Sequence, residues 1–230
     1  MTRGKPQTLI DEKARLDAIR AAAKGSGWGA KQGVLFRQEG DWFLAVHLRR
    51  RASDAPATHL AELLAKPMAL DPLLWEVLGL PENTAQPLSF RYWGVFVCAA
   101  PLLASRTISG SGPDGTARAM LAAANDMIPE AMARLAAERF SDIARTSDGT
   151  DGQWRMAETI LHALRLEGDE AAALAMARAG PSTISISGLV DDGLRAGRDH
   201  NAIFLAMQAD DAPPPPPARM PGFWQRLFGG

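Results

Sequence analysis

The sequence predicts an α+β fold: an antiparallel sheet with helices on one face, followed by an all-helical unit and a Pro-rich tail. Three observations support this prediction. Residues 34–50 indicate a β-hairpin, because one set of alternate positions in 42–49 is apolar throughout and the other set becomes polar toward its end. Beyond residue 107 the chain becomes rich in Ala and other helix formers, and Pro213–Pro217 forms a stiff spacer. We therefore expect a sheet unit at 1–106, a helical unit at 107–210 and a tail at 211–230.

The first element should be a helix that Thr8 caps and Gly25 ends, because Thr is a good N-cap and Gly a common helix terminator. A hairpin should follow, with strands at 34–39 and 42–50 joined by a two-residue Gly-Asp turn. In its second strand, alternation places four apolar side chains on the core face: Trp42, Leu44, Val46 and Leu48.

The stretch from residue 58 to residue 103 should hold another strand, a short helix and a long extended segment. The Leu residues of 58–70 suit a helix or a strand, and their place between a hairpin and a helix start favours a strand. Asp71 and Pro72 fit the N-cap and first position of a helix that Gly79 ends. Residues 88–103 are rich in aromatic and β-branched side chains, which predicts extended chain.

In the second half we expect helices at 116–127, 129–145, 153–166, 169–179 and 199–208. Pro129 either separates the first two of these helices or kinks a single long one. Gly168 separates the third and fourth, which should form a helical hairpin.

Composition narrows the function classes. The net charge of −1 gives no general attraction to nucleic acid. Cys98 is the only cysteine, so no intramolecular disulfide can form, which suits a reducing compartment. The N-terminus has no apolar signal core, and no apolar stretch reaches the ~20 residues of a membrane helix. We expect a cytoplasmic protein, and the abundance of Ala, Arg, Gly and Pro suggests a GC-rich bacterial genome.

No catalytic, cofactor or metal motif stands out. Residues 110–115 match G-x-G-x-x-G, but Pro113 removes a backbone donor and Asp114 places a negative charge where a phosphate would bind, so a loop between units is favoured. The four histidines share no metal-ligand spacing, and we expect neither a metal nor a cofactor.

Basic side chains on and after the predicted strands form one candidate site. Arg37, His47, Arg49 and Arg91 could line a basic face that binds a phosphate or an acidic group. The alternative, which we favour here, is charge that protects a strand edge.

The C-terminal peptide is a second candidate site. Phe223, Trp224, Leu227 and Phe228 fall on one face of a short helix, with Arg226 beside them. Three interpretations remain open: docking of this face on a protein partner, folding back on the chain's own body, and weak peripheral contact with a membrane.

Part of the first half resembles bacterial α+β domains of unknown function. The likeness rests on the residues of 66–71, Leu74 and Trp75, the Pro-Glu-Asn of 81–83 and the residues of 87–91. It implies an α+β fold and brings no catalytic residues. The sequence thus favours a non-enzymatic interaction or adaptor protein that docks through its tail. The rival is a small-molecule enzyme or ligand-binding protein with a site between the two units.

Overall fold

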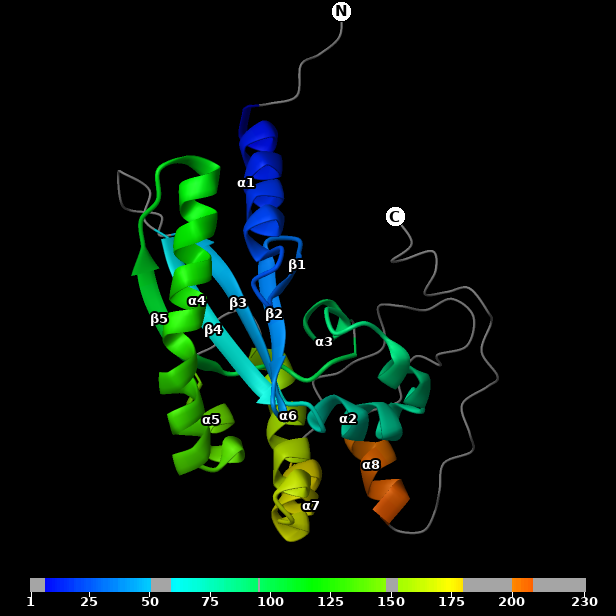
Figure 1. Ribbon diagram of the computed structural model, residues 1–230. Coiled ribbons are helices and arrows are strands. Elements are labelled where there is room, and N and C mark those ends of the chain that lie inside the picture. Colours follow the sequence, from blue (N-terminus) through cyan, green and yellow to red (C-terminus); the bar gives the residue numbers. More distant parts are fainter. Residues whose placement is uncertain (1–6, 51–58, 95, 148–152, 180–199, 209–230) are drawn as a thin grey trace, which may run out of the picture.

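The structure is a computed structural model that describes residues 7–50, 59–94, 96–147, 153–179 and 200–208. Its fold is α+β, as the sequence predicts. Five strands form one antiparallel sheet in the order β1-β2-β3-β4-β5, so that each strand pairs with its sequence neighbour (Figure 1). The strands are β1 (Gly29–Lys31), β2 (Val34–Glu39), β3 (Trp42–Arg50), β4 (His59–Pro67) and β5 (Leu102–Ile108). The strand expected within residues 58–70 is confirmed as β4.

The predicted hairpin is confirmed as β2 and β3. Gly40 has a φ of 55° at the turn, a conformation that favours glycine. The four side chains predicted for the core face of β3 do pack in the main core. Phe43 and Ala45, which alternate with them, are also fully buried, in a smaller cluster on the other face of the sheet. Both faces of β3 are therefore covered over its first half.

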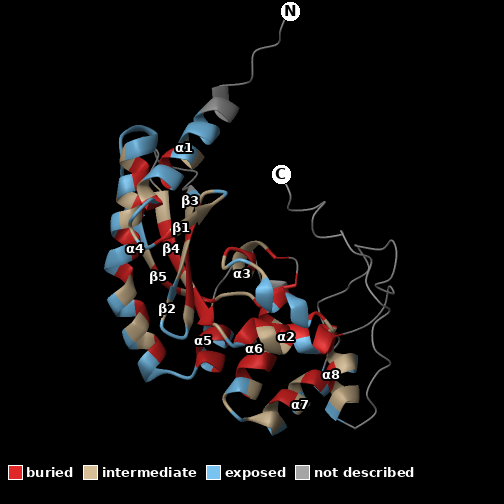
Figure 2. Ribbon diagram, turned by 45° about the vertical axis from the view of Figure 1, so that its right-hand side comes forward, coloured by how far each residue is buried: buried red, intermediate tan, exposed pale blue. Residues whose placement is uncertain are grey.

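Two helices cover one face of the sheet: α1 (Gln7–Ala23) and α4 (Gly112–Ala137) (Figures 1 and 2). Thr8 lies inside α1 rather than at its cap. Met120 and Met127 of α4 are fully buried in the same core as the sheet residues. The boundary between units that the sequence suggests after residue 106 falls within β5. The helix α4, which follows that boundary, packs against β4, β5 and α1 and so belongs to the same core as the sheet.

Between β4 and β5 the chain forms α2 (Leu70–Leu78), a 3-10 turn η1 (Pro81–Ala85) and α3 (Phe90–Trp93). The prediction of an extended segment over 88–103 is wrong for its first half, which contains α3. Phe90 packs with its ring 6.1 Å from that of Trp75, so this aromatic-rich stretch serves as a packed short helix instead of a strand. We call the face of the sheet away from α1 and α4 the open face. Leu88, Tyr92 and Trp93 pack against one end of it, over Phe43.

The remaining helices are α5 (Phe140–Thr146), α6 (Gln153–Leu166), α7 (Glu170–Ala179) and α8 (His200–Gln208). Pro129 lies inside the single helix α4, and a separate α5 follows. The hairpin around Gly168 is confirmed as α6 and α7, with Gly168 at a φ of 77°. A second apolar cluster joins α2, α6, α7 and α8. No helix in the described ranges is both long and apolar enough to cross a lipid bilayer.

The glycine motif at 110–115 forms the start of α4. Gly112 and Pro113 open the helix, and Ser111 precedes it. A Cβ atom at Gly110 would lie 2.4 Å from the backbone nitrogen of Thr116, so this glycine allows the loop to pack against the helix start. Close packing therefore explains why position 110 is a glycine, and no bound ligand is needed for that explanation.

Candidate functional site

A cluster of four polar side chains lies on the open face of the sheet, and we call it the His47 cluster: His47, Arg49, Glu62 and Tyr92. His47 on β3 and Glu62 on β4 are cross-strand partners, so their side chains leave the sheet side by side. The Nε2 atom of His47 lies 2.7 Å from Oε2 of Glu62, and its Nδ1 atom lies 2.8 Å from the hydroxyl of Tyr92 on α3. Nη2 of Arg49 lies 2.8 Å from Oε1 of Glu62.

The partners of His47 fix the direction of its hydrogen bonds. An ionised carboxylate only accepts, so His47 donates Nε2–H to Glu62. In the neutral ring, Nδ1 is then an acceptor, and the hydroxyl of Tyr92 donates to it. If the phenol proton moves to Nδ1, the resulting imidazolium is stabilised by the carboxylate, which is how a His–carboxylate pair activates a nucleophile. The arrangement is thus capable of proton transfer at Tyr92.

The cluster combines a buried carboxylate with two partly exposed basic side chains. The side chain of Glu62 is 9% exposed, that of His47 25% and that of Arg49 49%. A carboxylate so far removed from water needs charged or hydrogen-bonding partners, which His47 and Arg49 supply. As these exposed fractions show, the histidine and the arginine reach solvent, whereas the carboxylate that orients them is buried.

A second group of charged residues, which we call the buried triad, positions Tyr92: Lys66, Asp71 and Arg91. Lys66 and Asp71 are fully buried, with Nζ of Lys66 2.8 Å from Oδ1 of Asp71. Nη1 of Arg91 donates to Oδ2 of Asp71 at 3.0 Å and to the carbonyl oxygen of Met68 at 2.8 Å. Lys66 also donates to the backbone carbonyl of Arg91, at 2.8 Å. Both the side chain and the backbone of Arg91 are held, which fixes the next residue, Tyr92, against His47.

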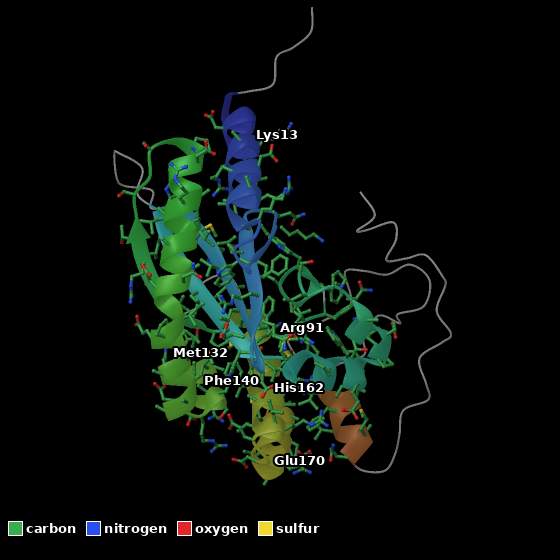
Figure 3. The ribbon with its side chains drawn as sticks, viewed as in Figure 1. Lys13, Arg91, Met132, Phe140, His162 and Glu170 are labelled. Carbon is green, nitrogen blue, oxygen red and sulfur yellow. The ribbon has the colours of Figure 1, made fainter. Side chains whose placement is uncertain are left out.

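Asp71 therefore has a different role from the predicted helix cap. Ala69 occupies the N-cap position of α2, and no side chain in the described part of the chain caps the helix. Oδ1 of Asp71 instead accepts from Lys66 and from the backbone nitrogen of Cys98, 2.8 Å away. Figure 3 shows Arg91 where the sheet meets α2 and α3. The triad joins the end of β4 to the inserted segment that carries α3.

The thiol of Cys98 lies beside this triad and is buried. Removal from water raises the pKa of Cys98 well above its usual value, and the negative charge of Asp71 raises it further. A thiol in this state is a poor nucleophile, and Cys98 serves as part of the main apolar core.

The structure brings together only part of the predicted basic face. His47 and Arg49 meet through Glu62. The guanidinium of Arg91 is committed to Asp71. Arg37 lies on the opposite face, because it pairs in register with core-facing Leu44; it forms an ion pair with Glu39 and stacks over Trp28 at 5.3 Å. The predicted tail residues, Phe223, Trp224, Arg226, Leu227 and Phe228, lie outside the described residues.

Sequence reasoning missed Glu62 and Tyr92. A signal for Glu62 was present, since a glutamate within an otherwise apolar strand needs a partner. Its partner follows only from the register of β3 with β4. Tyr92 is the only tyrosine in the chain, but its approach to His47, 45 residues earlier, depends on the buried triad and could not be read from spacing.

A third polar group is a histidine pair beside the second apolar cluster, where His162 of α6 and His200 of α8 are both fully buried. Their Nε2 atoms are 3.0 Å apart. Within the ranges that the structure describes, no three His, Cys, Asp or Glu side chains are grouped so that they could hold a metal ion.

Comparison of the chain with protein families, with curated proteins and with solved structures gave no match.

Proposed function

We propose that this protein binds a small anionic molecule at the His47 cluster and exchanges a proton with it through Tyr92. The observation that supports the proposal is the continuous hydrogen-bonded chain from Tyr92 through His47 to Glu62. Such a chain couples a weak acid to an oriented base, which is the arrangement that general acid–base chemistry requires.

Each member of the cluster has a distinct role in this proposal. Tyr92 passes its hydroxyl proton to Nδ1 of His47 as it takes a proton from the ligand, and the reverse transfers return the proton from His47 through Tyr92 to the ligand. Glu62 fixes the orientation of the imidazole and balances its charge. Arg49, half of whose side chain is exposed, binds a carboxylate or phosphate group of the ligand, because a guanidinium pairs with such groups through two parallel hydrogen bonds.

The reactivity of the phenol tests the proton-transfer role, since Tyr92 is the sole tyrosine. The full-length protein is treated with an aryl sulfonyl fluoride, which reacts with tyrosines activated by a neighbouring base, and modification of residue 92 is followed by mass spectrometry. His47→Gln should slow the modification about a hundredfold, at the lower end of what a positioned base contributes. Glu62→Gln should slow it less, because the imidazole remains.

The matched control for Glu62→Gln is Glu130→Gln. Glu130 is exposed and forms an ion pair with Arg106, away from the cluster, and its replacement should leave the rate unchanged. If Tyr92 reacts at the same rate in the protein without substitutions and in His47→Gln, the cluster is only structural, and the proton-transfer role is overturned.

Anion binding is tested separately, with inorganic phosphate and acetate as probes. Backbone amide NMR signals of β3 and β4 near Arg49 should shift on titration, and Arg49→Gln should remove the shifts. Absence of shifts with both anions would overturn the anion-binding role while leaving the reactivity of Tyr92 as a separate result.

A second proposal concerns the C-terminal peptide, which we propose docks on a protein partner. Its support comes from the sequence, where four large apolar side chains of residues 223–228 follow a five-proline spacer. Pull-downs with the full chain and with a chain that lacks residues 213–230 should retain different proteins. Identical sets would contradict docking, and sedimentation with anionic vesicles would separate membrane contact from a protein partner.

A further inference from the structure

The last described helix, α8, packs on the rest of the chain around Phe204. Phe204 of α8 is fully buried among apolar residues of α2, α6 and α7, which include Val77, Leu161 and Ala173. The helix has nine residues and packs mainly on α7 and α2. A helix of this length does not form stably in water by itself, so its structure depends on this contact.

A histidine pair lies within the same contact. The rings of His162 on α6 and His200 on α8 meet edge to face, with centroids 5.0 Å apart and Nε2 atoms 3.0 Å apart. Neither side chain has any exposed surface. Nδ1 of His200 lies 3.0 Å from Oδ1 of Asn201, which fixes one end of that ring, whereas Nδ1 of His162 is buried and has no hydrogen-bond partner among the residues that the structure describes.

Complete burial favours neutral rings at this pair. One Nε2 must carry a hydrogen and the other must accept it. A proton taken up at Nδ1 of the donor ring leaves this hydrogen bond in place, because the imidazolium Nε2–H still donates to the neutral ring. The cost lies in burial: an imidazolium at position 162 would place a positive charge in a site with no exposed surface and would leave an N–H group at Nδ1 without an acceptor among the described residues.

The charged groups around the pair do not favour an imidazolium. Arg165, on the same helix, lies over the ring of Phe204 at 5.1 Å and forms a long ion pair of 3.6 Å with Glu76 of α2. Glu158, also on α6, is buried and has a partner of its own. The sequence of α8 contains no Asp, Glu, Lys or Arg.

The helices α7 and α5 also pack on α6. Figure 3 places Glu170 near the far end of α7 from His162. The other charged side chains of α5 and α7 are exposed: Asp142, Arg145 and Arg178. The pKa of His162 is lowered well below its usual value, first by burial and then by the neighbouring His200 and Arg165.

We propose that α8 is a proton-released latch, in which protonation of the His162–His200 pair detaches α8 and exposes the apolar surface of α2, α6 and α7 that Phe204 covers. The direction follows from the histidine chemistry. With α8 docked, His162 stays neutral; with α8 released, it regains the ordinary pKa of about 6.5. The docked state is therefore fully favoured above pH 6.5 and loses stability as the pH falls below that value, because release takes up a proton.

Hydrogen exchange of the full-length protein tests the latch. Protection of the α8 amides, corrected for the intrinsic exchange rate at each pH, should fall by up to tenfold per pH unit below about pH 6.5, the slope for one proton taken up on release. Protection of the β3 amides, which belong to the main core, should stay constant over the same range. Equal behaviour of α8 and β3, or constant protection of α8 down to pH 5, would overturn the latch.

Substitutions test whether the pH-dependent loss of α8 protection comes from the histidine pair. His162→Phe keeps an aromatic ring and cannot titrate at position 162, so α8 should lose the part of its pH response that His162 contributes, whereas the control His59→Gln in β4 should retain the full response. If His162→Phe does not fold, the NMR signals of the histidines in the protein without substitutions provide the alternative test. The signals of His162 and His200 must titrate in the interval in which α8 loses protection, and titration outside that interval would overturn the proposal, as would a full pH response in a folded His162→Phe.

Discussion

At the scale of single residues, the buried triad is the most unusual feature of this chain. Lysine and aspartate are rarely buried completely, and they are tolerated only when every polar atom finds a partner. All three N–H groups of Lys66 are used, by Asp71, by the carbonyl of Arg91 and by the carbonyl of Cys98 at 2.6 Å. Removal of Asp71 would leave two cations without their counter-ion.

Replacement of Asp71 by Ala should therefore lower the free energy of unfolding by about 3–5 kcal/mol, the cost of breaking a buried ion pair by removing one partner. Urea unfolding followed by circular dichroism measures the change. Asp142→Ala removes an exposed ion pair with Arg145 and should cost about 1 kcal/mol or less. Similar losses in the two variants would mean that the triad contributes no more than a surface pair.

At the scale of elements, local sequence signals fix where several helices end. Gly79 follows α2 with a φ of 68°, and its backbone N–H bonds to carbonyls of the last turn. Gly25 and Gly168 have similar left-handed conformations after α1 and α6. These ends are readable from sequence because a left-handed residue strongly favours glycine.

The variant Gly79→Ala should lower the free energy of unfolding by about 1–2 kcal/mol, because a Cβ atom is unfavourable in the left-handed conformation. Thermal or chemical unfolding measures the loss. Asn tolerates this conformation better, so Gly79→Asn should recover part of the stability. An equal loss in both variants would point to a packing effect rather than to the backbone.

At the scale of the whole molecule, the sheet and α4 form one core. Met120, Ala124 and Met127 of α4 are fully buried with side chains from β2, β3 and β4. The strand β5 crosses the position at which the sequence suggests a boundary, and α4 follows it directly. The core therefore depends on residues from both sides of that boundary.

A fragment of residues 1–106 should fail to fold, since it lacks the end of β5 and all of α4 and would leave the helix-facing side of β4 uncovered. Circular dichroism and a urea titration of this fragment measure the outcome, with the full chain as the reference. A cooperative unfolding transition of the fragment would show that the first 106 residues form a domain on their own.

The candidate site could be predicted only in part. His47 and Arg49 were identified because a histidine and an arginine at alternate positions of a strand share a face. Arg37 was grouped with them, although its position in β2 places it on the other face. That assignment needs the register between strands, which a single strand's pattern does not contain.

Local signals in the chain account for the hairpin at 34–50, the helical hairpin at 153–179 and the glycines that end helices, because alternation, periodicity and backbone conformation act over a few residues. The approach of Tyr92 to His47 and of His162 to His200 was decided only by the tertiary structure. These pairs are 45 and 38 residues apart, and they meet because buried charges and apolar packing bring distant segments together. Neither interaction leaves a regular spacing in the chain.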